Sequence, residues 1–156
     1  GVLFELSHEL DYIRWVFGDV EIISSLIANT GTLSIDVEDL VEVLMLARSS
    51  RGHRIIGTVH LDMLQPIATR RCRVIGETGV LEWDLVGGTV RHCDLTSSSW
   101  KTLFSRTNFQ RNETYIQQLK RFLSAADFER QDMANIHDGV AVLRMIGEIQ
   151  LHNKIN

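Results

Sequence analysis

Segments with the composition of β-strands follow one another through the middle of this chain with no helical segment between them. The expected strands are, in order, residues 20–29, 39–48, 53–64, 70–75, 80–85 and 89–95. Residues typical of turns separate them, such as those at 49–52 and 87–88. Antiparallel strands need only a short turn, whereas parallel neighbours need a crossover, usually a helix. The order therefore excludes a doubly wound parallel sheet and predicts an open, mostly antiparallel sheet of about six strands.

Helical periodicity is confined to the two ends of the chain. Apolar residues recur at spacings of four, three and four from Leu6 to Phe17. Ser7 is placed to cap this first helix, and Gly18 to end it in the left-handed conformation.

Two more helices are expected at about 112–126 and 136–152. Their apolar stripes are Ile116, Leu119, Phe122 and Leu123 in the first and Val140, Leu143, Ile146 and Ile149 in the second. Residues 96–108 are polar and show no clear pattern. The chain is thus expected to be α+β, with its three helices on one face of the sheet.

The segment 39–48 is apolar on both of its faces. Val41 and Val43 point to one side of the expected strand, and Leu44 and Leu46 point to the other. One set can pack against the helices. The other set, together with Ile56, would leave an apolar patch on a monomer, and monomers rarely expose patches above a few hundred Å². We therefore expect this face to form a subunit interface in a homodimer or tetramer.

Length and composition indicate an ordinary soluble domain. The chain has 156 residues and no Ser/Gly-rich linker, so one domain spanning 1–156 is expected. The net charge of −4 argues against a nucleic-acid or anionic-membrane partner. No apolar run is long enough to span a bilayer. The two cysteines, Cys72 and Cys93, lack the spacing of a metal site or a disulfide framework. These observations predict a cytoplasmic domain with two reduced thiols and no metal.

The sequence has no phosphate-binding motif. A dinucleotide fold places G-x-G-x-x-G between a strand and a helix, where the glycines let backbone amides approach the pyrophosphate. The glycine-rich segments 76–79 and 87–88 lie between expected strands and lack that pattern. We interpret both as turns, and we expect no bound nicotinamide cofactor in this chain by itself.

A histidine lies in the first turn of the first helix, surrounded by acids. His8 is followed by Glu9, Asp11 and Tyr12, and Glu5 precedes it by three positions. An imidazole titrates near neutral pH and is suited to accept a proton there. Single histidines often have a structural role, so the residue pattern by itself leaves both readings open.

A second histidine shares a strand face with an acid. His60 and Asp62 are separated by two positions, so they point to the same side of the expected strand. This pair could line a pocket, or it could form part of a salt-bridged sheet face or subunit contact.

The stretch Ser-His-Glu-Leu-Asp-Tyr-Ile-Arg-Trp-Val-Phe-Gly, residues 7–18, resembles the opening helix of the C-terminal domain of the glucose-fructose oxidoreductase/inositol dehydrogenase (Gfo/Idh/MocA) family. The segments 39–43, 60–62, 76–84 and 138–143 fit the same family in order. Many members have an aspartate four residues before the histidine; here that position is Phe4, and Glu5 lies three before. The residues around His60 and Asp62 resemble a subgroup associated with nucleotide-sugar and surface-polysaccharide pathways.

The resemblance implies the substrate-binding and oligomerisation domain of an NAD(P)-dependent sugar or nucleotide-sugar dehydrogenase. In that family a dinucleotide-binding domain precedes this one, and no such domain is contained in the present chain. His8 would be the catalytic base, and Glu5, Asp11 and Tyr12 would contact the sugar. Arg106 could serve an anionic group of the substrate. The fragment by itself is expected to be inactive.

Two other functions remain open from the sequence. One is a stand-alone ligand-binding or assembly module with the same fold and no catalysis. The other is a dimeric α+β barrel-like protein that binds a small ligand on its own sheet.

Overall fold

The computed structural model describes residues 1–49, 52–106, 110–124 and 134–154. The chain is α+β, as expected, and its strands form two antiparallel sheets, one of three strands and one of four. It divides into two compact units, Gly1–Gln65 with Gln131–Asn156, and Pro66–Arg130. The division falls at the single proline of the chain, although no linker composition marks it. Among the described helices, none combines the length and apolarity needed to cross a membrane.

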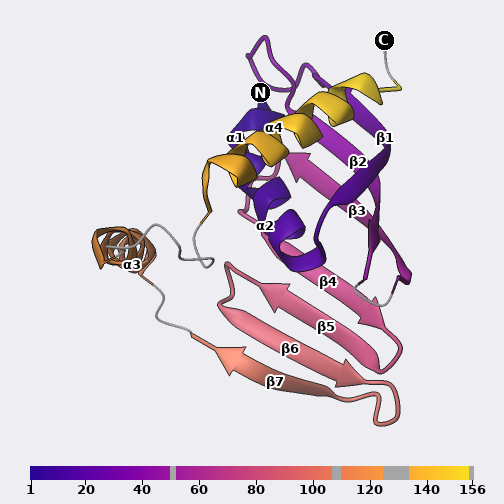
Figure 1. Cartoon of the computed structure of the whole chain (residues 1–156), viewed down its shortest axis with the longest axis vertical. Helices are drawn as coiled ribbons and strands as arrows, with labels where there is room; N and C mark the ends of the chain where they lie inside the picture. The colour runs from indigo at the N-terminus through magenta and orange to yellow at the C-terminus, as the bar shows by residue number, and fades with distance from the viewer. Residues whose placement is uncertain (50–51, 107–109, 125–133, 155–156) are drawn as a thin grey trace. The chain divides into compact units, whose positions relative to one another are not determined.

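The first unit is a three-stranded sheet with helices on one face (Figure 1). Its strands are β1 (Val20–Ala28), β2 (Leu40–Arg48) and β3 (Arg54–Asp62), in the order β1-β2-β3. Its helices are α1 (Val2–Glu5), α2 (Ser7–Phe17) and α4 (Ile136–Leu151). The hairpin expected between β2 and β3 is confirmed, with Leu40 opposite Asp62 and Arg48 opposite Arg54.

The core of this unit lies between the sheet and the helices. Val41 and Val43 of β2 are buried there, while Leu44 and Leu46 on the other face are half-buried, so the strand alternates as predicted. Leu10 of α2 is 1% exposed, and Ile149 of α4 is 0% exposed. All of these buried side chains belong to one apolar cluster that α1, α2, α4 and the three strands share.

The buried face of α4 differs from the expected one. Ile146 is buried as predicted, but Val140 and Leu143 are exposed, and Val142 and Met145 are buried in their place. The helix is apolar around much of its circumference, so its sequence periodicity does not define one stripe. Its start is well defined, because Asn135 and Asp138 form a capping box.

The second unit contains a four-stranded meander, in which each strand pairs with the next along the chain. Its strands are β4 (Arg71–Gly76), β5 (Gly79–Asp84), β6 (Thr89–Asp94) and β7 (Trp100–Ser105). The turn at 87–88 joins β5 to β6 as expected. Gly88 has φ of 61°, and a Cβ there would lie 2.3 Å from the backbone oxygen of Arg106. Glycine is therefore required by close packing against the chain's own backbone.

Strand β7 falls in the polar segment 96–108, for which no secondary structure was expected. All six of its residues are exposed, so it lacks the alternation of buried and exposed positions that marks a half-buried strand. Its composition, with Trp100, Thr102 and Phe104, is the signal that could have predicted it.

Helix α3 (Arg111–Ser124) forms where it was expected, but it belongs to the second unit. Its predicted stripe is exposed, since Ile116, Leu119, Phe122 and Leu123 each retain half or more of their accessible surface. The expectation that three helices pack on one face therefore holds for the first and last helical regions, and the structure does not show it for α3.

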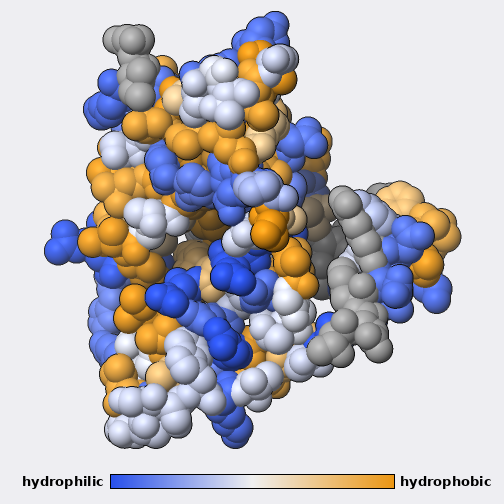
Figure 2. Space-filling view, turned by 180° about the vertical axis from the view of Figure 1, so that it is seen from behind, coloured by the Kyte–Doolittle hydropathy of each residue, from blue (hydrophilic) through white to orange (hydrophobic). Residues whose placement is uncertain are grey.

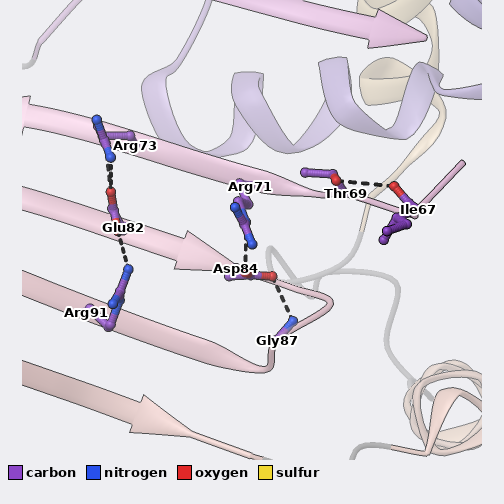
Figure 3. Close-up of polar contacts among 8 residues, drawn as sticks. All are labelled: Ile67, Thr69, Arg71, Arg73, Glu82, Asp84, Gly87 and Arg91. Atoms are coloured by element: carbon purple, nitrogen blue, oxygen red, sulfur yellow. Dashed lines mark hydrogen bonds and ion pairs between the residues drawn. The ribbon is translucent and has the colours of Figure 1, made fainter. Parts of the chain in front are cut away.

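One face of the second sheet carries a row of ion pairs across its strands (Figure 3). Glu82 on β5 accepts hydrogen bonds from Arg73 on β4 and from Arg91 on β6. These three residues are direct cross-strand neighbours, with Arg73 opposite Glu82 and Glu82 opposite Arg91. Asp84 pairs with Arg71 at 2.8 Å and accepts the N–H of Gly87 at 2.7 Å, which fixes the turn after β5. The charged row thus favours the observed register of the meander.

Candidate active site

The first turn of α2 holds His8, as predicted, but Ser7 does not cap the helix. Helix α1 ends at Glu5, and Leu6 connects it to α2 with φ of −101° and ψ of 22°. A capping serine needs an extended backbone, whereas Ser7 is already the first residue of α2. The reason is the short helix α1, which brings the chain into α2 without an extended step. The same helix places Glu5 on a helical turn.

Helix α2 ends at Gly18, with φ of 77° and ψ of −162°. The positive φ was expected, but ψ differs from that of a left-handed helix. This combination is accessible essentially only to glycine. The expectation of a glycine stop is confirmed, in a different conformation.

The imidazole of His8 lies next to a carboxylate from its own helix. Nε2 of His8 is 3.1 Å from Oε1 of Glu9, and the His8 side chain is 54% exposed while that of Glu9 is 14% exposed. A half-buried carboxylate can hold the ring in one orientation, and the exposed part of the ring remains available to a ligand. This geometry fits a proton acceptor positioned at a helix N-terminus.

The other residues expected at the site lie on two different units. Asp11 and Tyr12 follow His8 by three and four positions on α2, and Tyr12 also packs against the apolar core. Glu5 is exposed at the end of α1. Arg106 lies in the second unit, where its guanidinium pairs with Glu113 of α3. Glu5, His8, Asp11 and Tyr12 thus lie near the start of α2 in the first unit, and substrate contact by these residues and by Arg106 remains a prediction.

The pair His60 and Asp62 forms a charged cluster on the outward face of the first sheet. Nδ1 of His60 is 2.5 Å from Oε1 of Glu42 on β2, and Nε2 is 2.8 Å from Oδ2 of Asp62. Asp62 also accepts hydrogen bonds from the backbone N–H groups of Leu64 and Gln65 and from the Gln65 side chain. This is a salt-bridged sheet face, one of the two readings that the sequence allowed. Sequence reasoning missed Glu42, which only the pairing of β2 with β3 places opposite His60.

The cluster changes the pKa of two of its members. The hydrogen bond to Glu42 raises the pKa of His60, partial burial opposes this, and the bond to Asp62 adds to it. Burial by itself would raise the pKa of Asp62, but its hydrogen bonds from Gln65, Leu64 and His60 outweigh burial and lower the pKa to about 2. Both ring nitrogens of His60 can donate to carboxylates only when the ring is protonated. The cluster is therefore most stable with a cationic His60 between two carboxylates.

We predict that this cluster makes folding stability depend on pH. The pKa of His60 is higher in the folded chain than in the unfolded chain. Its contribution to the free energy of unfolding is therefore fully present below the pKa of an unfolded histidine, and it is lost as pH rises through the pKa of the folded state. Asp62 acts on the acid side, where its contribution is lost as pH falls from 3.8 towards about 2. The His60 side chain is 47% exposed, so solvent screening limits its effect to at most about 1 kcal/mol. Urea unfolding of the chain at several pH values measures this effect. In a His60→Gln variant the decline above neutral pH should be absent, and an unchanged decline would assign it to other groups.

The described residues do not provide a cradle for a dinucleotide. Both glycine-rich turns join antiparallel strands, and neither leads into a helix. Among the described residues, no group of three or more His, Cys, Asp or Glu side chains could hold a metal ion. Cys72 and Cys93 are free, partly buried thiols in strands, as expected.

The fold is similar to that of several solved dehydrogenases. Levoglucosan dehydrogenase, in complex with NADH and levoglucosan, matches with a TM-score of 0.79 at 14% identity, covering 97% of this chain and 48% of that one. UDP-N-acetylglucosamine 3-dehydrogenase from Acidithiobacillus ferrooxidans matches with a TM-score of 0.74 at 15% identity, covering 98% and 47%. The WlbA dehydrogenase from Bordetella pertussis, in complex with NADH and UDP-GlcNAcA, matches with a TM-score of 0.59 at 16% identity, covering 97% and 42%.

At these identities the likeness concerns the fold, and the chain spans about half the length or less of each of these structures. A search of curated proteins found no significant match. The sequence profile described as the GFO/IDH/MocA C-terminal domain matches residues 1–82, which is more than half of the chain. The chain therefore belongs to the Gfo/Idh/MocA family, as a C-terminal domain of that family.

Proposed function

We propose that this chain is the substrate-binding and oligomerisation domain of a cytoplasmic NAD(P)-dependent dehydrogenase that acts on a sugar or nucleotide sugar. The observation that carries the proposal is the exposed imidazole of His8 at the start of α2, held by Glu9. The similar structures include sugar and nucleotide-sugar dehydrogenases, which supports this substrate class.

His8 would act as the proton acceptor. Oxidation of a secondary alcohol to a ketone removes a hydride and a proton, and a positioned imidazole can take the proton near neutral pH. The hydride acceptor would be bound outside these 156 residues, because the described residues do not fit a dinucleotide. Glu5, Asp11 and Tyr12 would orient the sugar hydroxyls, since hydroxyl, carboxylate and imidazole groups form the hydrogen bonds that a polyol requires.

The first test compares the 156-residue chain with the parent chain that would carry it. The parent should bind NADH and oxidise a sugar or UDP-sugar from a panel, whereas the 156-residue chain should do neither. Calorimetry with NADH and the absorbance of the reduced nicotinamide give both readouts. Micromolar NADH binding to the 156-residue chain, or a parent chain inactive with every substrate and both cofactors, would contradict the proposal.

The oligomerisation part of the proposal rests on the outward face of the first sheet. Leu44 and Leu46 are half-buried there, and their neighbour Ile56 is 75% exposed. Figure 2 shows this side of the first unit in its upper half, with hydrophobic residues among hydrophilic ones. An apolar centre surrounded by charged groups such as His60 and Glu42 has the composition of a protein–protein interface.

We predict that Ile56→Glu weakens self-association. A carboxylate at this position would have to lose its hydration within an apolar contact between two copies. Light scattering at micromolar concentrations should show a dimer or tetramer for the wild-type chain and a shift towards monomer for the variant. Ile75→Glu is the matched control, since Ile75 is 76% exposed on the other unit. A monomeric wild-type chain would remove the basis for this interface.

A further inference from the structure

The outward face of the first sheet carries opposite charges at its two ends. Arg48 and Arg54 are exposed, and they lie directly opposite each other at the end where β2 turns into β3. Even numbers of residues separate them from Glu42 on β2 and from Asp62 on β3, so all four point to the same face. The two carboxylates lie at the other end, on either side of His60. The face is therefore dipolar along its strands.

The arginine end is unfavourable in a single copy of the chain. Like charges directly opposite each other on neighbouring strands are destabilising. Within the described residues, no carboxylate forms an ion pair with either Arg48 or Arg54. Glu21 on β1 lies at the same end, but it pairs with Leu46 of β2, and β2 separates β1 from β3. A carboxylate supplied by another molecule would therefore stabilise this end of the face.

The two charged ends are related by a simple geometric operation. Arg48 and Glu42 each lie three residues from Met45 on β2, about 10 Å along the strand in opposite directions. A half-turn about an axis at the level of Met45, in the plane of the face and perpendicular to β2, exchanges their positions. The apolar side chains of Leu44 and Leu46 lie on either side of this axis. A second copy related by this axis would place apolar centre over apolar centre and each charged end over its opposite.

We propose that two copies of the chain pack face to face through this sheet with their β2 strands antiparallel, and that Arg48 of each copy pairs with Glu42 of the other. The proposal rests on the oligomerisation part of the proposed function and adds the orientation of the two copies and the residues that select it. The occupant is a second copy, because the charge pattern of this face complements itself. A two-fold contact repeats the pair, so each dimer contains it twice.

The charges also disfavour the other two-fold arrangement of the same two faces. An axis parallel to the strands would place Arg48 against Arg48 of the second copy and Glu42 against Glu42. Like charges brought together in an interface weaken association strongly, so opposite charges at the two ends select the antiparallel orientation. Arg48 and Glu42 are specificity-determining residues in this arrangement, and the apolar centre supplies the buried area.

Charge reversal tests the pairing at neutral pH and low salt. Arg48→Glu and Glu42→Arg each create two like-charge contacts per dimer, so each variant by itself should have a dissociation constant about 10²-fold above that of the wild type. An equimolar mixture of the two variants should form a heterodimer, because both contacts then join opposite charges. Its dissociation constant should return to within about tenfold of the wild-type value. Sedimentation velocity measures these constants, and native mass spectrometry identifies the heterodimer by its mass.

Ionic strength provides the second readout. Added sodium chloride screens exposed charges, so it should weaken the wild-type dimer and strengthen the dimers of the two single variants. Arg144→Glu is the matched control, since it makes the same charge change at an exposed position of α4 and should associate like the wild type. Glu42→Arg also removes the contact with His60, so urea unfolding checks the fold of each variant. Arg48→Glu and its salt dependence test the proposal without that change.

Three results would contradict the proposal in distinguishable ways. A wild-type dimer without a heterodimer in the mixture of folded variants would overturn the orientation and leave oligomerisation intact. A heterodimer of Arg48→Glu with the wild type that is tighter than the wild-type dimer would assign the axis parallel to the strands. A monomeric wild-type chain would overturn the oligomerisation part of the proposed function, and this proposal with it.

Discussion

Replacement of His8 by alanine in the parent enzyme should lower kcat by about 10²–10⁴-fold, the usual contribution of a general base. The imidazole is partly exposed at the start of α2, with a carboxylate oxygen of Glu9 at 3.1 Å. The methyl group of alanine cannot accept the proton that leaves a sugar hydroxyl. Because the cofactor would be bound outside this chain, cofactor affinity should remain nearly unchanged.

Two further variants separate proton transfer from a structural role. His8→Asn keeps a hydrogen-bonding group of similar size, but an amide cannot take the proton, so activity should not return. Glu9→Gln keeps the side-chain shape and a hydrogen-bonding oxygen that can orient the ring, so it should retain most of the rate. Steady-state kinetics over neutral and alkaline pH test all three. Wild-type turnover in the His8→Ala enzyme would show that another group carries the proton.

Replacement of Leu10 by alanine should destabilise the chain by about 2–5 kcal/mol, the range found for leucine-to-alanine changes in protein cores. Leu10 is 1% exposed and belongs to the cluster that joins α2 to the sheet and to α4. The change removes apolar contacts and leaves a cavity under the helix that carries His8. Urea unfolding of the 156-residue chain, followed by circular dichroism, measures the loss.

Trp15→Ala provides the matched control for this change. It lies on the same helix and introduces the same residue, so the change in helix propensity is comparable, but Trp15 is 82% exposed. Its effect on unfolding should stay within about 0.5 kcal/mol, as for most surface substitutions. A stability loss as large as that of Leu10→Ala would mean that Trp15 packs against the folded unit in solution.

The local sequence pattern was sufficient to predict most of the secondary structure. The composition of residues 39–48 predicted the position of β2, and the structure buries Val41 and Val43, one of the two apolar sets that the sequence offered. The turns at 76–79 and 87–88 identified two hairpins through residues that tolerate tight backbone bends. Strand β7 was not predicted from the sequence. All of its residues are exposed, so burial imposes no period on its sequence.

The sequence predicted the helix that carries the candidate site, but it did not predict every contact of the site residues. His8 was placed correctly in the first turn of α2, because the position of a residue within a helix is a local property. The expected cap at Ser7 was wrong, since it assumed an extended approach to the helix and the chain enters through α1. The ion pair of Arg106 with Glu113 joins the residue after β7 to the first turn of α3, and no sequence pattern specifies this contact.

By itself, the sequence determined the α+β class, the antiparallel hairpins, the limits of most elements and the position of His8, because each depends on neighbours within a few turns or one hairpin. Only the tertiary structure decided which residues from distant elements meet. Strand pairing placed Glu42 against His60, and the division at Pro66 separated the strands into two sheets. The packing of α4 on β1 and α2 buried Val142 and Met145 and left Val140 and Leu143 in water. The physical reason is that burial and cross-strand pairing are properties of the assembled fold, and a helix or strand with apolar residues on several sides can satisfy them in more than one way.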